Sequence, residues 1–260
     1  MIRRGLKRDI LILLAMIADE VYANSFKNQL RRMYCDGWYQ KSSFGPTMAK
    51  LLSVGEIERV EKKGQLFYRL TSQGFEKLKE EIPILDFSGK PWDGRWRIVI
   101  FDIKEENKIL REALRSKLLS LGFGMWQRSV YITPHPIEQE INQYLKSKKL
   151  FPFAFCLVAK RSQLGNDKIL ANYVWKLDKI NEEYEEFIVQ CQRLSEKLES
   201  KEGDFGEIRK LWLKYKELIF KDPHLPKELL PDNWLRDKSR LAFLKLYQKA
   251  MRSQSDLLRV

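Results

Sequence analysis

The first set of side chains that could do chemistry is a group of carboxylates near the middle of the 260-residue chain. Asp102 lies near the end of an apolar run that begins at Trp96, and Glu105 and Glu106 follow it. Carboxylates are ligands for Mg²⁺, which can assist phosphodiester hydrolysis. Glu105 and Glu106 begin a predicted helix, however, where acidic side chains simply complement the helix dipole. Two interpretations of Asp102 stay open: it contributes to a metal site, or it is a strand-end or helix-capping residue.

A second set combines hydroxyl and basic side chains in the first quarter of the chain. A short helix that presents small polar and cationic groups suits the major groove of DNA, and lysines on a hairpin turn suit backbone phosphates. Our candidates for groove or phosphate contacts are Ser42, Ser43, Thr47 and Lys50. Our candidates for phosphate contacts alone are Lys41, Lys62 and Lys63. The alternative for the same surface is binding to a protein.

The overall charge also favours a polyanionic partner. The chain has 48 Lys and Arg against 35 Asp and Glu, a formal net charge of +13. Residues 89–165 are the most basic per residue, with 14 basic and 7 acidic side chains. In this segment Lys108, Arg111 and Arg115 follow one another at helical spacing. This stripe is either a solvated helix face or a contact for DNA or an acidic effector.

Residue types that mark common enzymes are scarce. The three cysteines, Cys35, Cys156 and Cys191, are far apart and form no zinc motif, so we expect reduced thiols in a cytoplasmic protein. The two histidines, His135 and His224, are too few for a His-rich metal site. No Gly-rich phosphate loop or nucleophile elbow is present. We therefore expect no enzyme activity, no catalytic or metal-binding residue and no cofactor.

The N-terminus has two interpretations. Basic residues precede the apolar run Ile10–Ala18, which is the outline of a secretory signal. Acidic residues flank the run, however, and it is far shorter than the roughly 20 residues of a membrane-spanning helix. We predict a buried first helix over Asp9–Asp19 and no membrane association.

The first segment has the element order of a winged helix-turn-helix. A second helix is predicted from Ser25 to Cys35, and a third contains Pro46 and ends at Gly55, with Ser42 or Ser43 as its cap. Met48, Leu51 and Leu52 are spaced to form its buried face. Strands Ile57–Val60 and Leu66–Leu70 form a hairpin, and Thr71 caps a helix over residues 75–81.

The middle and last segments predict a ferredoxin-like domain and a helical domain, and so an α+β protein. Strands at 96–103, 125–127, 130–133 and 153–159 and helices at 107–121 and 137–148 give the order βαββαβ. Helices at 177–198, 208–219 and 240–251 follow, packed in a bundle rather than a coiled coil, with a proline-rich break at 222–234. Polar breaks divide the chain into 1–88, 89–165 and 166–260.

Several of these stretches resemble one family. The segment PWDGRWRIVIFDI, followed by LREALRSKLLSLGFGMWQRSVYITP, is similar to the central domain of PaaX-like transcriptional regulators. The segment DPHLPKELLPDNW is similar to their C-terminal domain, although Leu235–Asp237 replace the usual small residues. YRLTSQG resembles the second wing strand of many bacterial regulators. The central domain also resembles the small metal-dependent nuclease subunit of CRISPR adaptation complexes, through Asp102 and Gln127–Val130.

The resemblance implies a homodimeric repressor that binds double-stranded operator DNA, one half-site per winged helix. It also implies release by a small anionic effector such as an acyl-CoA thioester, although no residue of this sequence selects that effector. Two alternatives stay open. The resemblance to the nuclease subunit implies a Mg²⁺-dependent nuclease in which Asp102 from two protomers holds the ion, and the other alternative is a non-catalytic scaffold for nucleic acid. The operator, the regulated genes and the sign of regulation do not follow from the sequence.

Overall fold

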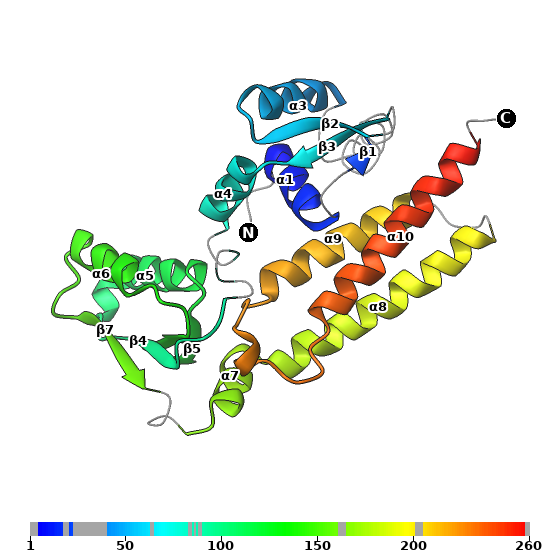
Figure 1. The fold of residues 1–260 in the computed structure, drawn as a ribbon. Helices are drawn as coiled ribbons and strands as arrows, with labels where there is room; N and C mark the ends of the chain where they lie inside the picture. Colours follow the sequence, from blue (N-terminus) through cyan, green and yellow to red (C-terminus); the bar gives the residue numbers. More distant parts are fainter. Residues whose placement is uncertain are drawn as a thin grey trace. The chain divides into compact units, whose positions relative to one another are not determined.

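The computed structural model describes residues 5–17, 21–22, 41–62, 65–82, 85, 87, 90–160, 165–200 and 205–257. The chain forms two compact units (Figure 1). The first unit contains residues 1–81, 183–219 and 235–260, and the second contains residues 82–182 and 220–234. Each unit is described by itself. The division into functional domains at residues 88 and 165 stays a prediction.

The N-terminal part of the first unit consists of short helices and a small antiparallel sheet. Its elements are α1 (Leu6–Ile17), β1 (Val21–Tyr22), η1 (Lys41–Ser43), α3 (Phe44–Ser53), β2 (Ile57–Lys62), β3 (Gln65–Leu70) and α4 (Ser72–Glu81). The sheet order is β1-β3-β2, and the register of the hairpin runs from Ile57 opposite Leu70 to Lys62 opposite Gln65. Both hairpin strands and the helix after Thr71 are as predicted. The helix predicted from Ser25 to Cys35 lies outside the described residues.

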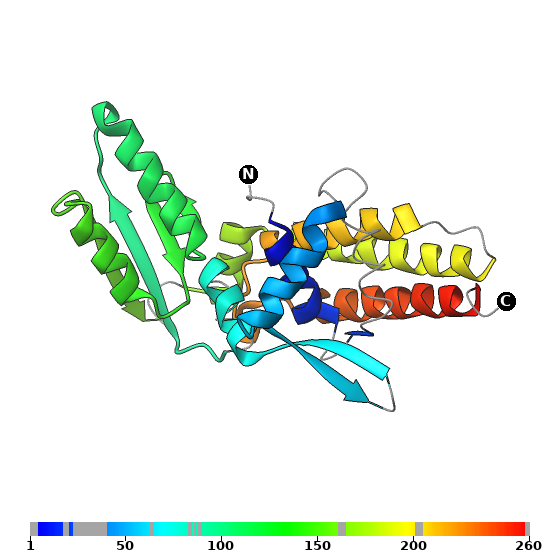
Figure 2. The same cartoon turned by 90° about the horizontal axis from the view of Figure 1, so that it is seen from above.

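Three long helices, of which α8 begins and α9 ends in the second unit, complete the first unit, and Figure 2 shows them side by side. They are α8 (Leu177–Glu199), α9 (Phe205–Lys221) and α10 (Arg236–Leu257). Aromatic side chains fill the space between them: the ring centroids of Phe187 and Tyr215 are 5.1 Å apart, and those of Trp212 and Phe243 are 5.7 Å apart. Burial of large rings in this number stabilises a packed bundle. This is the predicted packing of the last segment.

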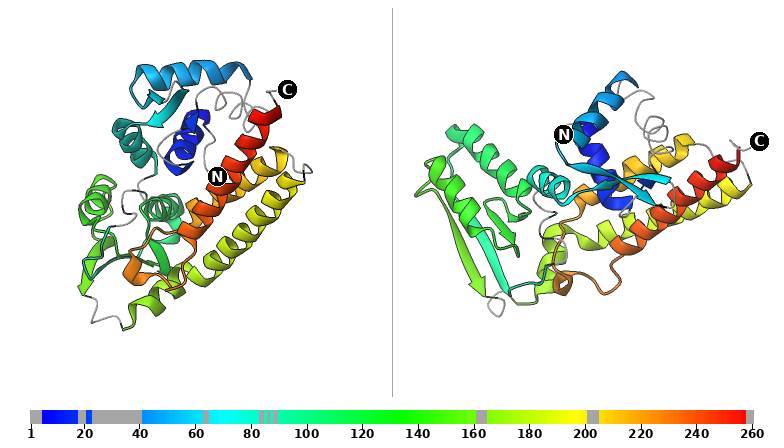
Figure 3. Two further views of the ribbon diagram at one scale, coloured as in Figure 1. Left: turned by 45° about the vertical axis from the view of Figure 1, so that its right-hand side comes forward. Right: turned by 45° about the horizontal axis from the view of Figure 1, so that its top comes forward.

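The second unit contains the predicted βαββαβ order. Its elements are β4 (Arg95–Phe101), η3 (Glu105–Asn107), α5 (Lys108–Ser120), β5 (Gly124–Gln127), β6 (Val130–Thr133), α6 (Glu138–Ser147), β7 (Ala154–Lys160), α7 (Asp167–Trp175) and η5 (Lys227–Leu229). The four-stranded sheet has the order β5-β6-β4-β7, and its neighbouring strands are antiparallel. This strand order is that of a ferredoxin-like sheet. Figure 3 shows α5 and α6 side by side on one face of it.

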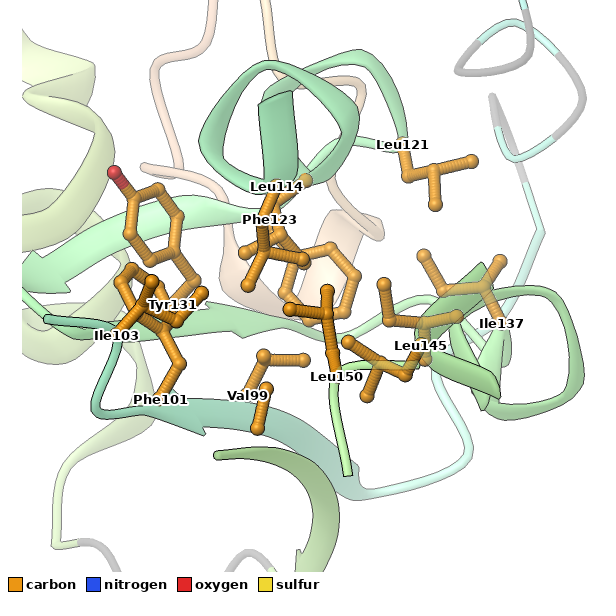
Figure 4. Packing of buried hydrophobic residues seen from close by; sticks show 13 residues of the cluster. Val99, Phe101, Ile103, Leu114, Leu121, Phe123, Tyr131, Ile137, Leu145 and Leu150 are labelled. Atoms are coloured by element: carbon orange, nitrogen blue, oxygen red, sulfur yellow. The ribbon is translucent and has the colours of Figure 1, made fainter. Parts of the chain in front are cut away.

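Each face of this sheet is covered by its own apolar cluster. On the side of α5 and α6, a cluster contains Val99, Leu114 and Tyr131 among others (Figure 4). On the opposite side, Trp96 and Ile98 pack with residues of α7 and with Leu229. The strand β4 is buried on both faces, which explains its nearly continuous apolar sequence.

The proline-rich segment 222–234 packs on the second of these clusters. Leu225, Leu229 and Leu230 are buried there. Asp222 accepts a hydrogen bond from the backbone N–H of His224 at 2.7 Å, which fixes the turn. Most residues of this segment therefore pack a rigid turn onto the cluster.

Candidate nucleic-acid interface

The helix α3 has one buried face and one exposed face. Phe44, Met48 and Leu51 are buried, while Leu52, predicted to join them, is only half-buried. Lys50 on the other side of the helix is exposed, and so is Ser42 in the preceding turn η1. Figure 1 shows α3 with the β2–β3 hairpin and α1 beneath it. Among the described residues, this face of α3 is exposed.

The hydroxyl groups of α3 are partly used within the helix itself. The Thr47 hydroxyl donates to the Ser43 carbonyl at 2.7 Å, and the Ser53 hydroxyl donates to the Lys50 carbonyl at 2.9 Å. Ser42 or Ser43 was expected to cap the helix: Ser43 stands at the cap position, but its side chain makes no capping hydrogen bond. Its backbone is already helical because the turn η1 leads directly into α3. Ser42 and Lys50 are the better placed of the four groove candidates.

The predicted phosphate-contacting lysines lie at the edges of what the structure describes. Lys41 begins η1 and Lys62 ends β2, but their side chains are outside the described part, and Lys63 lies outside the described residues. The strand β2 also exposes Arg59, which has no ion-pair partner among the described residues. Sequence reasoning missed Arg59. The sequence did contain a signal for it, because Arg59 is a basic residue on the predicted strand that leads to the Lys62-Lys63-Gly64 turn.

Thr71 and Gly74 hold the hairpin against α3. The Thr71 hydroxyl donates to the Gly55 carbonyl at 2.6 Å and accepts from the Gly74 N–H at 3.0 Å, which is the predicted cap of α4. Gly55 has φ +70°, a conformation that favours glycine, and it ends α3 as predicted. At Gly74 an added Cβ would lie 2.0 Å from the Glu56 carbonyl oxygen. These contacts tie the start of α4 to the turn between α3 and β2.

The basic stripe on α5 is largely neutralised by neighbours. Arg111 donates two hydrogen bonds to Glu105, at 2.5 and 2.9 Å, and this partner lowers the pKa of Glu105. Arg115 donates to Glu112 and to the Arg128 carbonyl, both at 3.0 Å. Lys108 is exposed. The stripe thus fits a solvated helix face better than a binding site for an anion.

Asp102 is exposed at the end of β4, where its N–H donates to the Phe153 carbonyl at 2.8 Å. Within the described ranges, no group of three or more His, Cys, Asp and Glu side chains could hold a metal ion. The metal interpretation required Asp102 from two protomers, so a single chain does not test it. Cys156 and Cys191 are free thiols, as expected, while Cys35 lies outside the described residues. Among the described helices, we find no stretch whose length and hydropathy suit a membrane span.

Comparisons with known proteins place these features in a family. Residues 89–171 match the family model described as the PaaX protein central Cas2-like domain, and residues 175–259 match the PaaX-like protein C-terminal domain. The chain belongs to the PaaX-like family of transcriptional regulators. Residues 1–88 lie outside these two matches, so the winged helix-turn-helix of this PaaX-like protein stays a prediction.

One curated relative and one solved structure are similar to this chain. The transcriptional repressor PaaX of Escherichia coli (strain K12) is 22% identical over 204 residues, which cover 75% of this PaaX-like chain and 63% of the repressor. The match thus spans less than two thirds of that relative. The uncharacterized protein Rv0674 from Mycobacterium tuberculosis has the same fold, with a TM-score of 0.55, 17% identity and coverage of 96% of this chain and 99% of that one.

Proposed function

We propose that this protein is a sequence-specific DNA-binding transcriptional regulator that acts as a repressor. The observation that carries the proposal is the exposed face of α3, where Lys50 stands opposite the buried Phe44, Met48 and Leu51, with exposed Ser42 in the turn η1 just before the helix. A short helix held by its apolar face and exposing small polar and cationic groups suits a recognition helix in the major groove. The family assignment, reached through other parts of the chain, supports it independently.

In this proposal the N-terminal part is a winged helix-turn-helix. The strands β2 and β3 form the wing, and Arg59 joins Lys41, Lys62 and Lys63 as a phosphate contact. Ser42, Ser43, Thr47 and Lys50 contribute groove or phosphate contacts. The net charge of +13 adds sequence-independent attraction to the duplex.

The active form is proposed to be a homodimer, each subunit contacting one half of a partly palindromic operator. Release by a small anionic effector, with an acyl-CoA thioester as the first compound to test, is proposed from the family alone. The cytoplasmic location stays a prediction.

A binding titration tests the proposal. The protein is titrated against the DNA upstream of its own gene, with excess nonspecific competitor and at several salt concentrations. Retained, sequence-selective binding is the expected result, since specific sites bind about 10³-fold or more tightly than nonspecific DNA. Binding that depends on salt alone, with no preference for the promoter, would overturn the repressor proposal and favour a nonspecific scaffold.

A further inference from the structure

The helix α1 of the first unit is enclosed on all sides. Its six consecutive residues 9–14 are all buried. Because an α-helix has about 3.6 residues per turn, six consecutive positions cover its whole circumference. An enclosed helix in a close-packed interior moves only together with its neighbours. The position of α1 is therefore set jointly by the elements packed around it.

Two ion pairs leave α1 on opposite sides. The Lys7 ammonium donates to the Glu56 carboxylate at 2.6 Å, and the Asp9 carboxylate accepts from the Lys216 ammonium at 2.8 Å. Residues two positions apart on an α-helix are rotated by about 200° around its axis. Lys7 therefore faces the turn that follows α3, and Asp9 faces α9 of the helical bundle.

The pair of Lys7 and Glu56 reaches the end of α3. Glu56 directly follows Gly55, and its N–H donates to the Leu51 carbonyl of α3 at 3.0 Å. The Glu56 side chain is 8% exposed, and its second carboxylate oxygen accepts no hydrogen bond from the described residues. A carboxylate so deeply buried needs its cation close by. Lys7 and the end of α3 are therefore held together.

The pair of Asp9 and Lys216 reaches the helical bundle. The Lys216 side chain is mostly buried and the Asp9 side chain is fully buried. Separating such a pair leaves a buried charge without compensation, which is strongly unfavourable. The place of Lys216 on α9 therefore constrains the place of α1.

We propose that Lys216 is a positioning residue for promoter recognition. It acts on the end of α3 through two ion pairs in series, the first with Asp9 and the second between Lys7 and Glu56. The inference rests on the proposed function, in which the exposed face of α3 reads DNA. The helical bundle then contributes to DNA recognition without touching the duplex.

Paired neutral substitutions in the full-length chain test the inference. Asp9→Asn with Lys216→Met removes one ion pair without leaving a buried charge, so the fold should be retained. Lys7→Met with Glu56→Gln removes the other ion pair in the same way. Each combination also leaves the net charge unchanged, so the sequence-independent attraction to DNA is preserved.

The matched control is Lys214→Met with Glu186→Gln. It breaks an exposed ion pair between α9 and α8, with 3.5 Å between its charged atoms, two residues along α9 from Lys216. Affinity is measured for the promoter and for a nonspecific duplex of the same length, at one salt concentration. Circular dichroism and thermal melting set a temperature at which every variant is folded.

We expect removal of either inner pair to lower promoter affinity roughly fivefold or more, a typical size for coupling between distant sites. Affinity for the nonspecific duplex should stay within about twofold, because no group proposed to contact DNA is replaced. Removing both pairs should cost little more than removing one, since links in series are not additive. The control should match the unmodified chain.

A role in stability alone would leave the ratio of promoter to nonspecific affinity unchanged in the folded variants. An unchanged ratio for Asp9→Asn with Lys216→Met, a loss no larger than that of the control, or additive losses for the two pairs would overturn the inference. If the unmodified chain itself shows no preference for the promoter, the proposed function and this inference are both overturned. If it does show that preference and the variants keep it, the inference alone is overturned.

Discussion

The Asp9 carboxylate of α1 lies 2.8 Å from the Lys216 ammonium of α9, and the Asp9 side chain is fully buried. The pair joins residues 207 positions apart. It belongs to the first unit and ties the N-terminal segment to the helical bundle. A buried carboxylate is tolerated only where cations and hydrogen-bond donors compensate for its lost hydration.

Lys216→Met should therefore destabilise the protein strongly. Removing one partner of a buried ion pair costs about 3 kcal/mol or more, since the remaining charge keeps its desolvation penalty. The free energy of unfolding from urea titrations measures the loss. The double variant Asp9→Asn with Lys216→Met should recover much of it, and a single-variant loss below about 1 kcal/mol would show that the pair is not buried as described.

Acid should destabilise the protein through His135. Its ring is buried, stacks on Phe87 at 4.3 Å, and burial lowers the pKa of His135 to about 4. In the unfolded chain the pKa of His135 is near 6.5, so the unfolded chain binds more protons than the folded chain between pH ~6.5 and ~4. The stability contributed by the buried neutral ring is therefore present above pH ~6.5 and is lost as the pH falls toward ~4. Between pH ~7 and ~5 the free energy of unfolding should fall by about 2 kcal/mol through His135.

Unfolding titrations of the unmodified chain and of His135→Phe across this range test the assignment. The aromatic variant keeps the stacking shape but does not titrate, so its stability should fall less steeply with acid. Equal slopes for the two proteins would contradict the prediction, because every other titrating group is common to both.

Replacing Asp167 should lower the free energy of unfolding more than replacing Asp232. The indole N–H of buried Trp96 donates to the Asp167 carboxylate at 2.8 Å, across the face of the sheet covered by α7. Asp167→Ala leaves that donor buried without this acceptor and should cost about 1–3 kcal/mol. The control Asp232→Ala breaks an exposed ion pair with Lys168 and should cost about 1 kcal/mol or less. Tryptophan fluorescence during denaturation compares them, and similar losses would count against the Trp96 bond.

Lys50→Ala should weaken promoter binding. If Lys50 contacts a base edge, the loss is about 1–3 kcal/mol and the preference for the promoter relaxes. If it contacts a phosphate, binding weakens on all sequences alike. Lys146→Ala, which removes an exposed lysine of α6, is the control for charge. Unchanged affinity for Lys50→Ala would remove α3 from the recognition surface.

The double variant Lys62→Ala with Lys63→Ala should flatten the salt dependence of DNA binding. Each lost phosphate contact lowers the slope of log K against log salt by about 0.9, so the pair should lower it by about 2. Gel-shift or fluorescence titrations at several salt concentrations give the slope. A slope equal to that of the unmodified protein would count against the wing.

The fold of the second unit was predictable because its signals are local. The apolar run from Trp96 and the leucines of α5 gave strand and helix by periodicity, and the glycines after α5 marked its end. The observed bounds shifted by a few residues, as with α10, which begins at Arg236 rather than Arg240. There the helix starts directly after the packed turn at Trp234, and no cap in the sequence marks that point.

The tertiary contacts could not be predicted in the same way. Nothing near Asp9 in the sequence indicates Lys216 as its partner, and the pairing of Arg111 with Glu105 turns a basic stripe into a largely neutral surface. At the candidate interface, spacing identified the buried face of α3 correctly at Met48 and Leu51. It could not show that the Thr47 hydroxyl bonds within the helix, because that depends on the turn before it.

The ion pair between Asp9 and Lys216 also constrains the order of events during synthesis. The first unit is assembled from three separate stretches of chain, and its last stretch begins at residue 235. The segment proposed to read DNA is synthesised some 200 residues before the cation that neutralises its buried carboxylate. The contiguous residues 82–182 of the second unit are made between the two. The ion pair, and the packing of α1 that depends on it, can therefore form only after most of the second unit has been synthesised.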